Sequence, residues 1–362
     1  MALLLVAQTR EARTAMRAAS LVPYVFDAPV RPLEWVTPPP IEEVARYTDG
    51  TRQLEGDLYR PGTAARHPAL VLSLGVHPVP RDDPALVRLA HGLARDGFVV
   101  LIPDSPDLRS DRILPTERDA FVAAIAYVRG LGDVDPARIG LVGFSVGASL
   151  LVVAAADPRA RDDVRMVNFF GGYYDATDLL REVAARQIVL DDGSTAPWEP
   201  APLARQIFAA VLLESVDASG DRAVASRALV DGVALSDAER DSLSARARLV
   251  YDIFTADSPA AVDVLLSRLP EDVRARLRDI SPSTHVHELH AKIFVMHDVD
   301  DAFVPYVESR RFVAALPPDQ RVYTEFSIFA HVEPTRSLDL PAFLGEVLKL
   351  VRHMYQALYE LT

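Results

Sequence analysis

The organisation of this chain is clearest in Ile139-Gly140-Leu141-Val142-Gly143-Phe144-Ser145-Val146-Gly147, which leads into the small and apolar run 148–156. An apolar run, a serine flanked by glycines and a helix-forming run predict a strand, a tight turn and a helix. The glycines suit a strained turn that leaves no room for side chains two residues to either side of the serine. This setting favours a serine hydroxyl lifted clear of the sheet over a serine that only caps the helix.

Outward from this stretch, continuous apolar runs alternate with amphipathic segments. The runs predict strands at 69–74, 98–102, 139–144, 164–170, 293–296 and 322–329, and the segments predict helices at 85–95, 118–131, 146–156, 304–316 and 341–361. Buried strands that alternate with helices are typical of a parallel sheet covered on both faces. Asp49-Gly50 predicts a turn between two short runs, so residues 46–60 should form an antiparallel hairpin at the sheet edge. The fold class is therefore α/β, with a mostly parallel central sheet flanked by helices.

The chain divides into three predicted parts. Pro38-Pro39-Pro40 cannot continue a helix or enter a central strand, so residues 1–40 should form an N-terminal arm. Residues 41–175 and 290–362 should form the α/β core. Residues 176–289 carry helical periodicity, strongest at 203–215, 237–255 and 260–269, without strand alternation. This insertion leaves and rejoins the sheet at the carboxyl ends of strands, so we expect a helical cap above the ligand crevice.

Composition excludes several classes of function. Among 362 residues the formal net charge is −13, which disfavours nucleic acid as a partner because phosphates are neutralised by clustered Lys and Arg. The absence of Cys excludes disulfides, thiolate metal sites and Cys nucleophiles. The apolar start, residues 1–7, lacks a preceding basic region and is shorter than the ~20 residues that span a bilayer, so a short packed helix and a cytoplasmic location are expected. A homo-oligomer stays open.

A serine hydroxyl becomes a good nucleophile only when a neighbouring base removes its proton, and an acid should orient that base. His331 follows a predicted strand and precedes the last helix, and it is the strongest candidate for the base. Asp298, Asp300 and Asp301 follow the strand at 293–296 and are candidates for the acid, with Asp175 as a competitor after an earlier strand. The cluster of His285, His287 and His290 matches no recognised metal-ligand motif, so no metal is expected.

Taken in order, these residues resemble the α/β-hydrolase family, and more narrowly its cap-bearing esterases and dienelactone-hydrolase-like members. The likeness covers about 45–361 apart from the insertion, and it keeps the family's order of Ser145, an acid loop at 297–305, and His331. In the family's His-Gly-x-x-Asp-x-x-Val-Pro pattern the acid falls at Asp301, although Asp298 replaces the usual glycine. Ser145 stands where dienelactone hydrolases carry Cys, so the resemblance does not imply their substrate.

The resemblance also implies where an oxyanion would be held. One backbone N–H should come from Val146 and a second from the loop after the strand at 69–74, where Val76 is the expected donor. The usual His-Gly pair of this loop aligns with Leu74-Gly75 here. His77 is expected to line the pocket, together with Phe144.

The set Ser145, Asp301 and His331 implies acyl transfer to water through an acyl-enzyme, on a small and uncharged apolar ester, without a cofactor. Alternatives on the same residues are a C–C bond hydrolase, an amidase or a peptidase, and a non-catalytic ligand-binding protein on this fold is a further alternative. The cap offers apolar surface, from which Trp198 is expected to contact the substrate. The other apolar cap candidates are Phe208, Leu212, Leu213, Tyr251 and Phe254.

Overall fold

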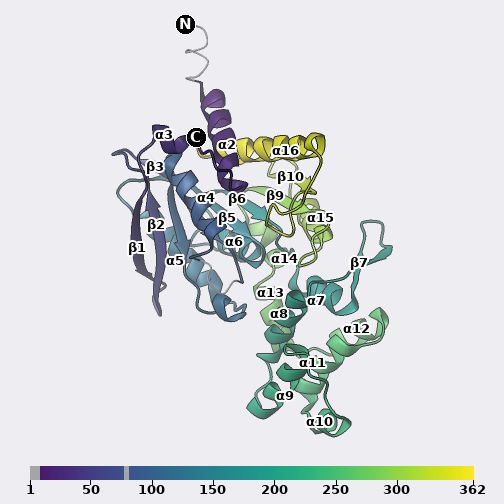
Figure 1. Cartoon of the computed structure of the whole chain (residues 1–362). Coiled ribbons are helices and arrows are strands. Elements are labelled where there is room, and N and C mark those ends of the chain that lie inside the picture. The colour runs from purple at the N-terminus through teal and green to yellow at the C-terminus, as the bar shows by residue number, and fades with distance from the viewer. Residues whose placement is uncertain (1–8, 77–80) are drawn as a thin grey trace.

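The computed structural model describes residues 9–76 and 81–362, and its centre is an eight-stranded sheet of order β1-β2-β4-β3-β5-β6-β9-β10 (Figure 1). The strands are β1 (Ile41–Thr48), β2 (Gln53–Arg60), β3 (His67–Ser73), β4 (Val99–Pro103), β5 (Val134–Phe144), β6 (Val164–Phe170), β9 (Lys292–Asp298) and β10 (Arg321–Phe326). β1 and β2 form an antiparallel edge hairpin, and every pair from β4 to β10 is parallel. The predicted fold class and the edge hairpin are confirmed.

Helices cover both faces of this sheet. α4 (Pro84–Arg95) and α16 (Leu340–Tyr359) lie on one face, and α5 (Glu117–Arg129), α6 (Val146–Ala156) and α15 (Tyr306–Ala315) lie on the other. Successive strand residues point to opposite faces, so Leu70 and Leu72 of β3 pack with α4 and α16, whereas Val71 between them packs on the other side. Burial on both faces explains why these strands are continuous apolar runs.

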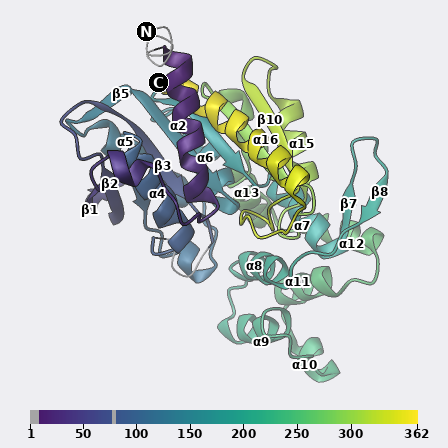
Figure 2. The ribbon, with the colours of Figure 1, turned by 45° about the horizontal axis from the view of Figure 1, so that its top comes forward.

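The described residues of the predicted arm, 1–40, include a helix that packs on the core. Helix α2 (Arg10–Val25) packs against α4 and α16 (Figure 2) and buries Ala18, Leu21 and Tyr24. Spacing of three to four residues gives the helix one apolar face, which needs a partner surface. The proline run lies between the short helix α3 (Leu33–Val36) and β1, and so comes after the packed helix α2. Residues 1–7 lie outside the described part of the chain.

Between β6 and β9 the chain is mostly helical, and its outer helices extend away from the sheet (Figure 1). Its helices are α7 (Ala176–Ala185), α8 (Pro202–Leu213), α9 (Ser219–Leu229), α10 (Asp237–Ser242), α11 (Ala245–Thr255), α12 (Pro259–Leu266), α13 (Glu271–Asp279) and α14 (Pro282–His285). The predicted helix 237–255 is two helices, because Ser244 accepts a hydrogen bond from the Ala247 N–H and begins α11. The hairpin of β7 (Gln187–Val189) and β8 (Thr195–Pro197) was not predicted.

Some strand boundaries also differ from the prediction. β5 begins five residues earlier, at Val134, and β10 ends at Phe326 instead of 329. After Phe326 the chain leaves the sheet. Two short 3-10 helices, Leu108–Ser110 and Val286–Glu288, complete the regular elements of the described chain. None of the helices within 9–76 and 81–362 is both long and apolar enough to cross a membrane.

Candidate active site

Ser145 lies on a strained turn between β5 and α6. Its backbone has φ 54° and ψ −138°, a conformation that L-residues rarely adopt, and its N–H donates to the Phe170 carbonyl at 2.8 Å. A Cβ added at Gly143 would lie 2.3 Å from the Cα of Ala148, so only glycine fits there. The turn therefore requires the spacing in the sequence, and the structure places the Ser145 side chain at the carboxyl end of the sheet.

The strand order reverses at β3. From β3 the chain crosses to β4 on one side, and from β4 it crosses back to β5 on the other side of β3. Crevices of α/β proteins form outside the carboxyl ends of strands at such a point. Ser145 follows β5, and the loop 74–76 follows β3, so both border the same crevice.

The loop after β3 lies directly on the first turn of α6. Gly75 has φ 86°, and a Cβ on it would lie 2.5 Å from the Gly147 nitrogen and 3.2 Å from the Val146 nitrogen. The Val146 N–H is the first of a helix and has no acceptor within that helix. The loop residue Val76 is thus held beside Val146, where an oxyanion would need two N–H donors. His77, expected to line the pocket, lies outside the described residues.

His331 and Asp301 meet at the edge of this crevice. The His331 Nδ1 lies 2.6 Å from Asp301 Oδ2, and the His331 backbone has φ 60°. The ring of Phe303 stacks on the imidazole with centroids 4.8 Å apart. Strained backbone at both Ser145 and His331 requires support from the surrounding structure, and such strain clusters at functional sites.

Asp301 is 2% exposed, and each of its oxygens has a defined role. Oδ1 accepts hydrogen bonds from the N–H groups of Phe303 at 2.7 Å and Val304 at 3.1 Å, which leaves Oδ2 for His331. Burial favours a higher pKa, but the charge of His331 and hydrogen bonds from His297 and His331 hold the pKa of Asp301 well below its usual range. The carboxylate is therefore ionised over the whole pH range in which proteins normally work.

The other candidate acids have other partners. Asp175 caps α7 through the Thr177 N–H at 2.8 Å. Asp298 Oδ2 accepts from the Phe329 N–H at 2.8 Å and so fixes the loop that carries His331. Asp300 pairs with Arg336. Asp301 alone among these carboxylates makes a hydrogen bond to His331.

His297 was included in the acid-loop pattern, but no role was predicted for it. It is fully buried, with Nδ1 2.6 Å from Ser309 Oγ and Nε2 2.8 Å from the Val304 carbonyl. Nε2 also lies 3.4 Å from Asp301 Oδ2. Its position at the end of β9, just before the acid loop, was the available signal. His297 holds the acid loop against α15 and adds a partner for the Asp301 carboxylate.

Trp198, which was expected to contact the substrate, also supports the acid loop. Its indole Nε1–H donates to the Asp301 carbonyl at 3.0 Å, and the nearby Ala201 N–H donates to the Ala302 carbonyl at 2.7 Å. The other expected cap residues Phe208, Leu212, Leu213 and Phe254 are buried in the main core, and Tyr251 packs against it. Their hydrophobic pattern reflects packing rather than a pocket.

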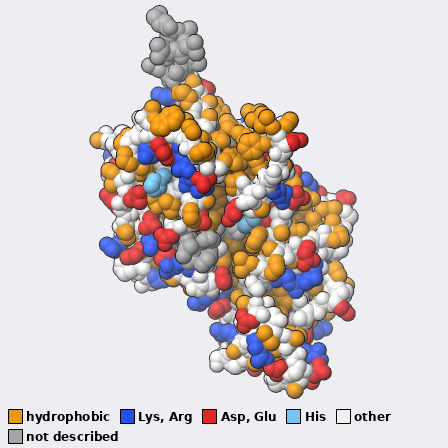
Figure 3. All heavy atoms as spheres, in the orientation of Figure 1, with side chains coloured by type: hydrophobic (Ala, Val, Ile, Leu, Met, Phe, Trp, Pro, Cys, Tyr) orange, Lys and Arg blue, Asp and Glu red, His pale blue; other side chains and the backbone are white. Residues whose placement is uncertain are grey.

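Ser145 and His331 both line a cavity of about 540 Å³, and Val76, Phe144 and Val146 line it too. This volume is within the range of small-molecule sites, ~300–1,000 Å³. From the insertion, the described lining residues are Leu203 and Ile207 of α8. The remaining wall comes mainly from the sheet and from α2, α4 and α16. Hydrophobic side chains also gather on the outer surface over α16 in Figure 3.

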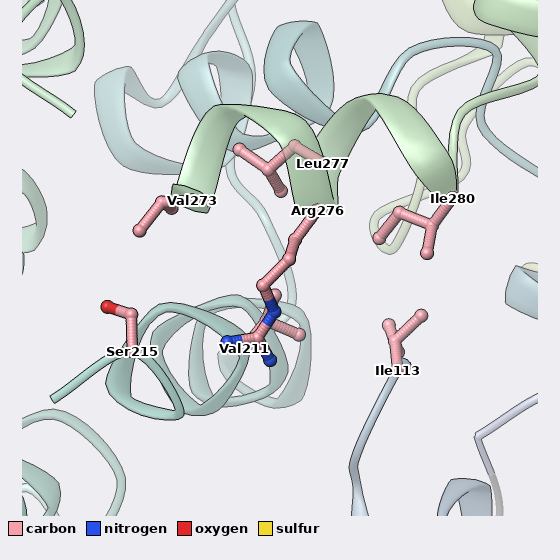
Figure 4. A pocket seen from close by; sticks show the side chains of 7 residues that line it. All are labelled: Ile113, Val211, Ser215, Val273, Arg276, Leu277 and Ile280. Carbon is pink, nitrogen blue, oxygen red and sulfur yellow. The ribbon is translucent and has the colours of Figure 1, made fainter. Parts of the chain in front are cut away.

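A second pocket, between α8, α13 and the segment that carries Ile113, is too small for a ligand. Figure 4 shows Arg276 of α13 extending between its apolar neighbours toward Val211. Its volume of about 10 Å³ is no more than roughly one water-sized sphere. It is a packing defect of the core.

The histidines near the end of the insertion pair with carboxylates. His290 Nδ1 lies 2.7 Å from Asp162, and His285 Nδ1 lies 3.6 Å from Glu288. Within the described residues, no group of three His, Cys, Asp or Glu side chains is arranged to hold a metal ion.

Comparison with solved structures finds dipeptidyl peptidase 4 of Porphyromonas gingivalis, with a TM-score of 0.50, 13% identity and 88% of this chain covered. The chain has the α/β-hydrolase fold. It spans 36% of the length of that peptidase. Other matches are 2,6-dihydroxy-pseudo-oxynicotine hydrolase (TM-score 0.49, 15% identity, covering 88% of this chain and 68% of that one) and Pyrococcus horikoshii acylaminoacyl peptidase (0.49, 14%, 88% and 40%). No protein-family model and no curated protein matches the chain.

Proposed function

We propose that this α/β-hydrolase-fold protein is a serine hydrolase that cleaves carboxylic esters through an acyl-enzyme on Ser145. The observation that carries the proposal is the hydrogen bond of 2.6 Å between His331 Nδ1 and Asp301, at a cavity that Ser145 also lines. Because Nδ1 donates to the carboxylate, the Nε2 lone pair of His331 is left to accept a proton. A base in this tautomer and a strained serine that line one cavity fit what nucleophilic catalysis requires.

In the proposed reaction, Ser145 Oγ attacks the ester carbonyl carbon while His331 Nε2 takes the hydroxyl proton. The tetrahedral oxyanion is held by the N–H groups of Val146 and Val76, and Asp301 stabilises the imidazolium. The imidazolium then gives its proton to the departing alkoxide, which leaves as the alcohol. Water, activated by the same imidazole, hydrolyses the acyl-enzyme and restores Ser145. No step needs a cofactor.

Support for an uncharged ester comes from the cavity wall. Most of the described lining side chains are hydrocarbon, so an unpaired charge would be costly to bury there; the polar exceptions are Ser145, His331, Asn168, Asp83 and Glu333. Amides, peptides and C–C bonds could be cleaved by the same groups. A panel that pairs p-nitrophenyl butyrate with butyryl p-nitroanilide tests these alternatives: the proposal expects turnover of the ester and no turnover of the anilide above background. Because an activated ester is intrinsically more reactive than an anilide, clear turnover of the anilide would favour an amidase or peptidase.

The pH dependence of kcat/KM tests His331 as the base. Activity is expected to fall in acid because protonated His331 cannot accept the serine proton, whereas Asp301, whose pKa is held well below its usual range, stays ionised. The measurement is kcat/KM against pH, with circular dichroism at each pH to establish that the protein is folded. A profile that stays flat into acid while the protein remains folded would argue against His331 as the base.

A further inference from the structure

From Ser145 the cavity extends back along the strands, between the sheet and helices α2, α4 and α16. Val142, Met166 and Leu70, from β5, β6 and β3, line it from the sheet side. Val142 belongs to a central strand covered by helices, yet it keeps part of its surface exposed, and that surface faces the cavity. The helices supply an opposing wall of apolar residues, among them Leu93 and Ala357.

We infer that the end of the cavity farthest from Ser145 is closed, because side chains crowd together there. Leu70 and Met166 both pair with Gly140, five residues before Ser145 along the chain. A Cβ built on Gly140 would lie 2.9 Å from Leu361 Cδ1, 3.0 Å from Leu70 Cδ2 and 3.0 Å from Met166 Cε. These side chains therefore crowd together at this level, about 16 Å from Ser145 at ~3.3 Å per strand residue.

One polar side chain interrupts the apolar inner wall. Asn168 of β6 lines the cavity, and its Oδ1 lies 3.0 Å from His353 Nε2 of α16. Burial lowers the pKa of His353 to about 3, so its ring is neutral, and its Nδ1 lies 2.9 Å from Thr324 Oγ1. The carbonyl of Asn168 is thus paired with the structure, and no charge faces the inner cavity from these described residues.

We propose that this cavity binds the acyl chain of the substrate, and that the substrate class is an ester of a long, extended aliphatic carboxylic acid. An extended polypeptide has three backbone bonds for every ~3.3–3.6 Å, and an extended aliphatic chain has a similar length per bond. The depth of the cavity therefore leaves room for an aliphatic chain on the order of a dozen carbons. The inference rests on the proposed function. Under this proposal the acyl-chain length is selected by side chains between the sheet and α16, and not by the insertion.

The closed end assigns the cavity to the acyl part rather than to the alcohol. In an acyl-enzyme mechanism the alcohol leaves before water enters, so it needs an open path to solvent, whereas the acyl group stays attached to Ser145. A chain retained through the reaction is the part that a closed cavity suits.

The first test is wild-type kcat/KM on p-nitrophenyl esters with acetyl, butyryl, octanoyl, decanoyl and hexadecanoyl chains. We expect a rise of up to roughly fourfold per buried methylene as far as the decanoyl ester, and a fall beyond it. Acetate esters of long alcohols should show no such rise. If the enzyme cleaves acetyl esters best and every longer chain more slowly, the esterase proposal stands and this inference is overturned. If no ester is cleaved, the proposed function itself fails.

The second test blocks the cavity from α16. Ala357→Phe should lower the ratio of decanoyl to butyryl kcat/KM by about tenfold or more, because several methylenes lose their burial. Ala342→Phe is the matched control, since Ala342 is exposed on the same helix and lies outside the cavity, and it should leave the ratio unchanged. An unchanged ratio in folded Ala357→Phe would overturn the inference.

A third variant covers the case in which Ala357→Phe does not fold. Met166→Ala removes side-chain volume at the closed end and should move the optimum to a longer chain, with thermal unfolding measured alongside because Met166 is buried. A folded Met166→Ala protein with the wild-type optimum counts against the proposal. If neither variant folds, the wild-type chain-length profile decides.

Discussion

Ser145→Ala should lower kcat for ester hydrolysis by about 10⁶, as in triads that have been dissected residue by residue. The loss is large because the variant lacks both the atom that forms the acyl-enzyme and the proton that His331 would take. What remains is binding and the N–H donors at Val146 and Val76. The measurement is kcat on p-nitrophenyl butyrate.

The fold should survive this change. The main fixed contact of the turn is the hydrogen bond from the Ser145 backbone N–H to Phe170, which alanine retains. Serine at 145 already places a Cβ on a residue with positive φ, and alanine keeps that Cβ. The substitution therefore adds no backbone strain. Ser219→Ala, an exposed serine of α9, is the matched control and should keep full activity. Near-normal activity of Ser145→Ala would remove Ser145 from the mechanism.

Asp301→Asn should lower kcat by roughly 10⁴. In the native loop, Oδ1 accepts two backbone N–H groups, so the asparagine oxygen should take that position and its NH₂ should replace Oδ2. The amide would then donate to His331 Nδ1, where the carboxylate accepted. His331 would carry its proton on Nε2, the atom that must accept the serine proton. The variant therefore has the right shape and the wrong tautomer.

Two other substitutions make matched controls for this prediction. Asp175→Asn and Asp300→Asn remove a carboxylate whose partners are a helix cap and Arg336, and each should keep kcat close to the wild-type value. A collapse of kcat in Asp175→Asn, with Asp301→Asn close to wild type, would move the acid to the end of β6.

The turn at Ser145 could be predicted because a short-range pattern determines it. In this turn Ser145 has a positive φ and a Cβ at Gly143 would clash with Ala148, so the spacing of serine and glycine indicates the geometry. Choosing Asp301 over Asp298 required the family pattern, because spacing alone gives three carboxylates before one helix. The structure separates the roles of these carboxylates: Asp298 accepts from the Phe329 N–H, and Asp300 pairs with Arg336.

The cavity could not be predicted from the sequence. Its wall combines residues from α2 to α16, such as Leu21, Met166 and Ala357, and each follows the pattern of an ordinary core residue. Whether apolar surfaces meet fully or leave a gap depends on side-chain packing across distant segments, which periodicity does not record. The hydrogen bond from Trp198 to the acid loop could not be predicted either, since an aromatic residue in a pattern does not reveal what its N–H contacts.

An activated nucleophile at Ser145 should react covalently with a fluorophosphonate. The native protein is treated with this reagent, and the modified residue is located by peptide mass spectrometry. We expect one phosphonyl group per chain, on Ser145, formed much more slowly in Asp301→Asn than in wild type. A native, folded protein that stays unlabelled, or that is labelled at another residue with Ser145 free, would contradict it.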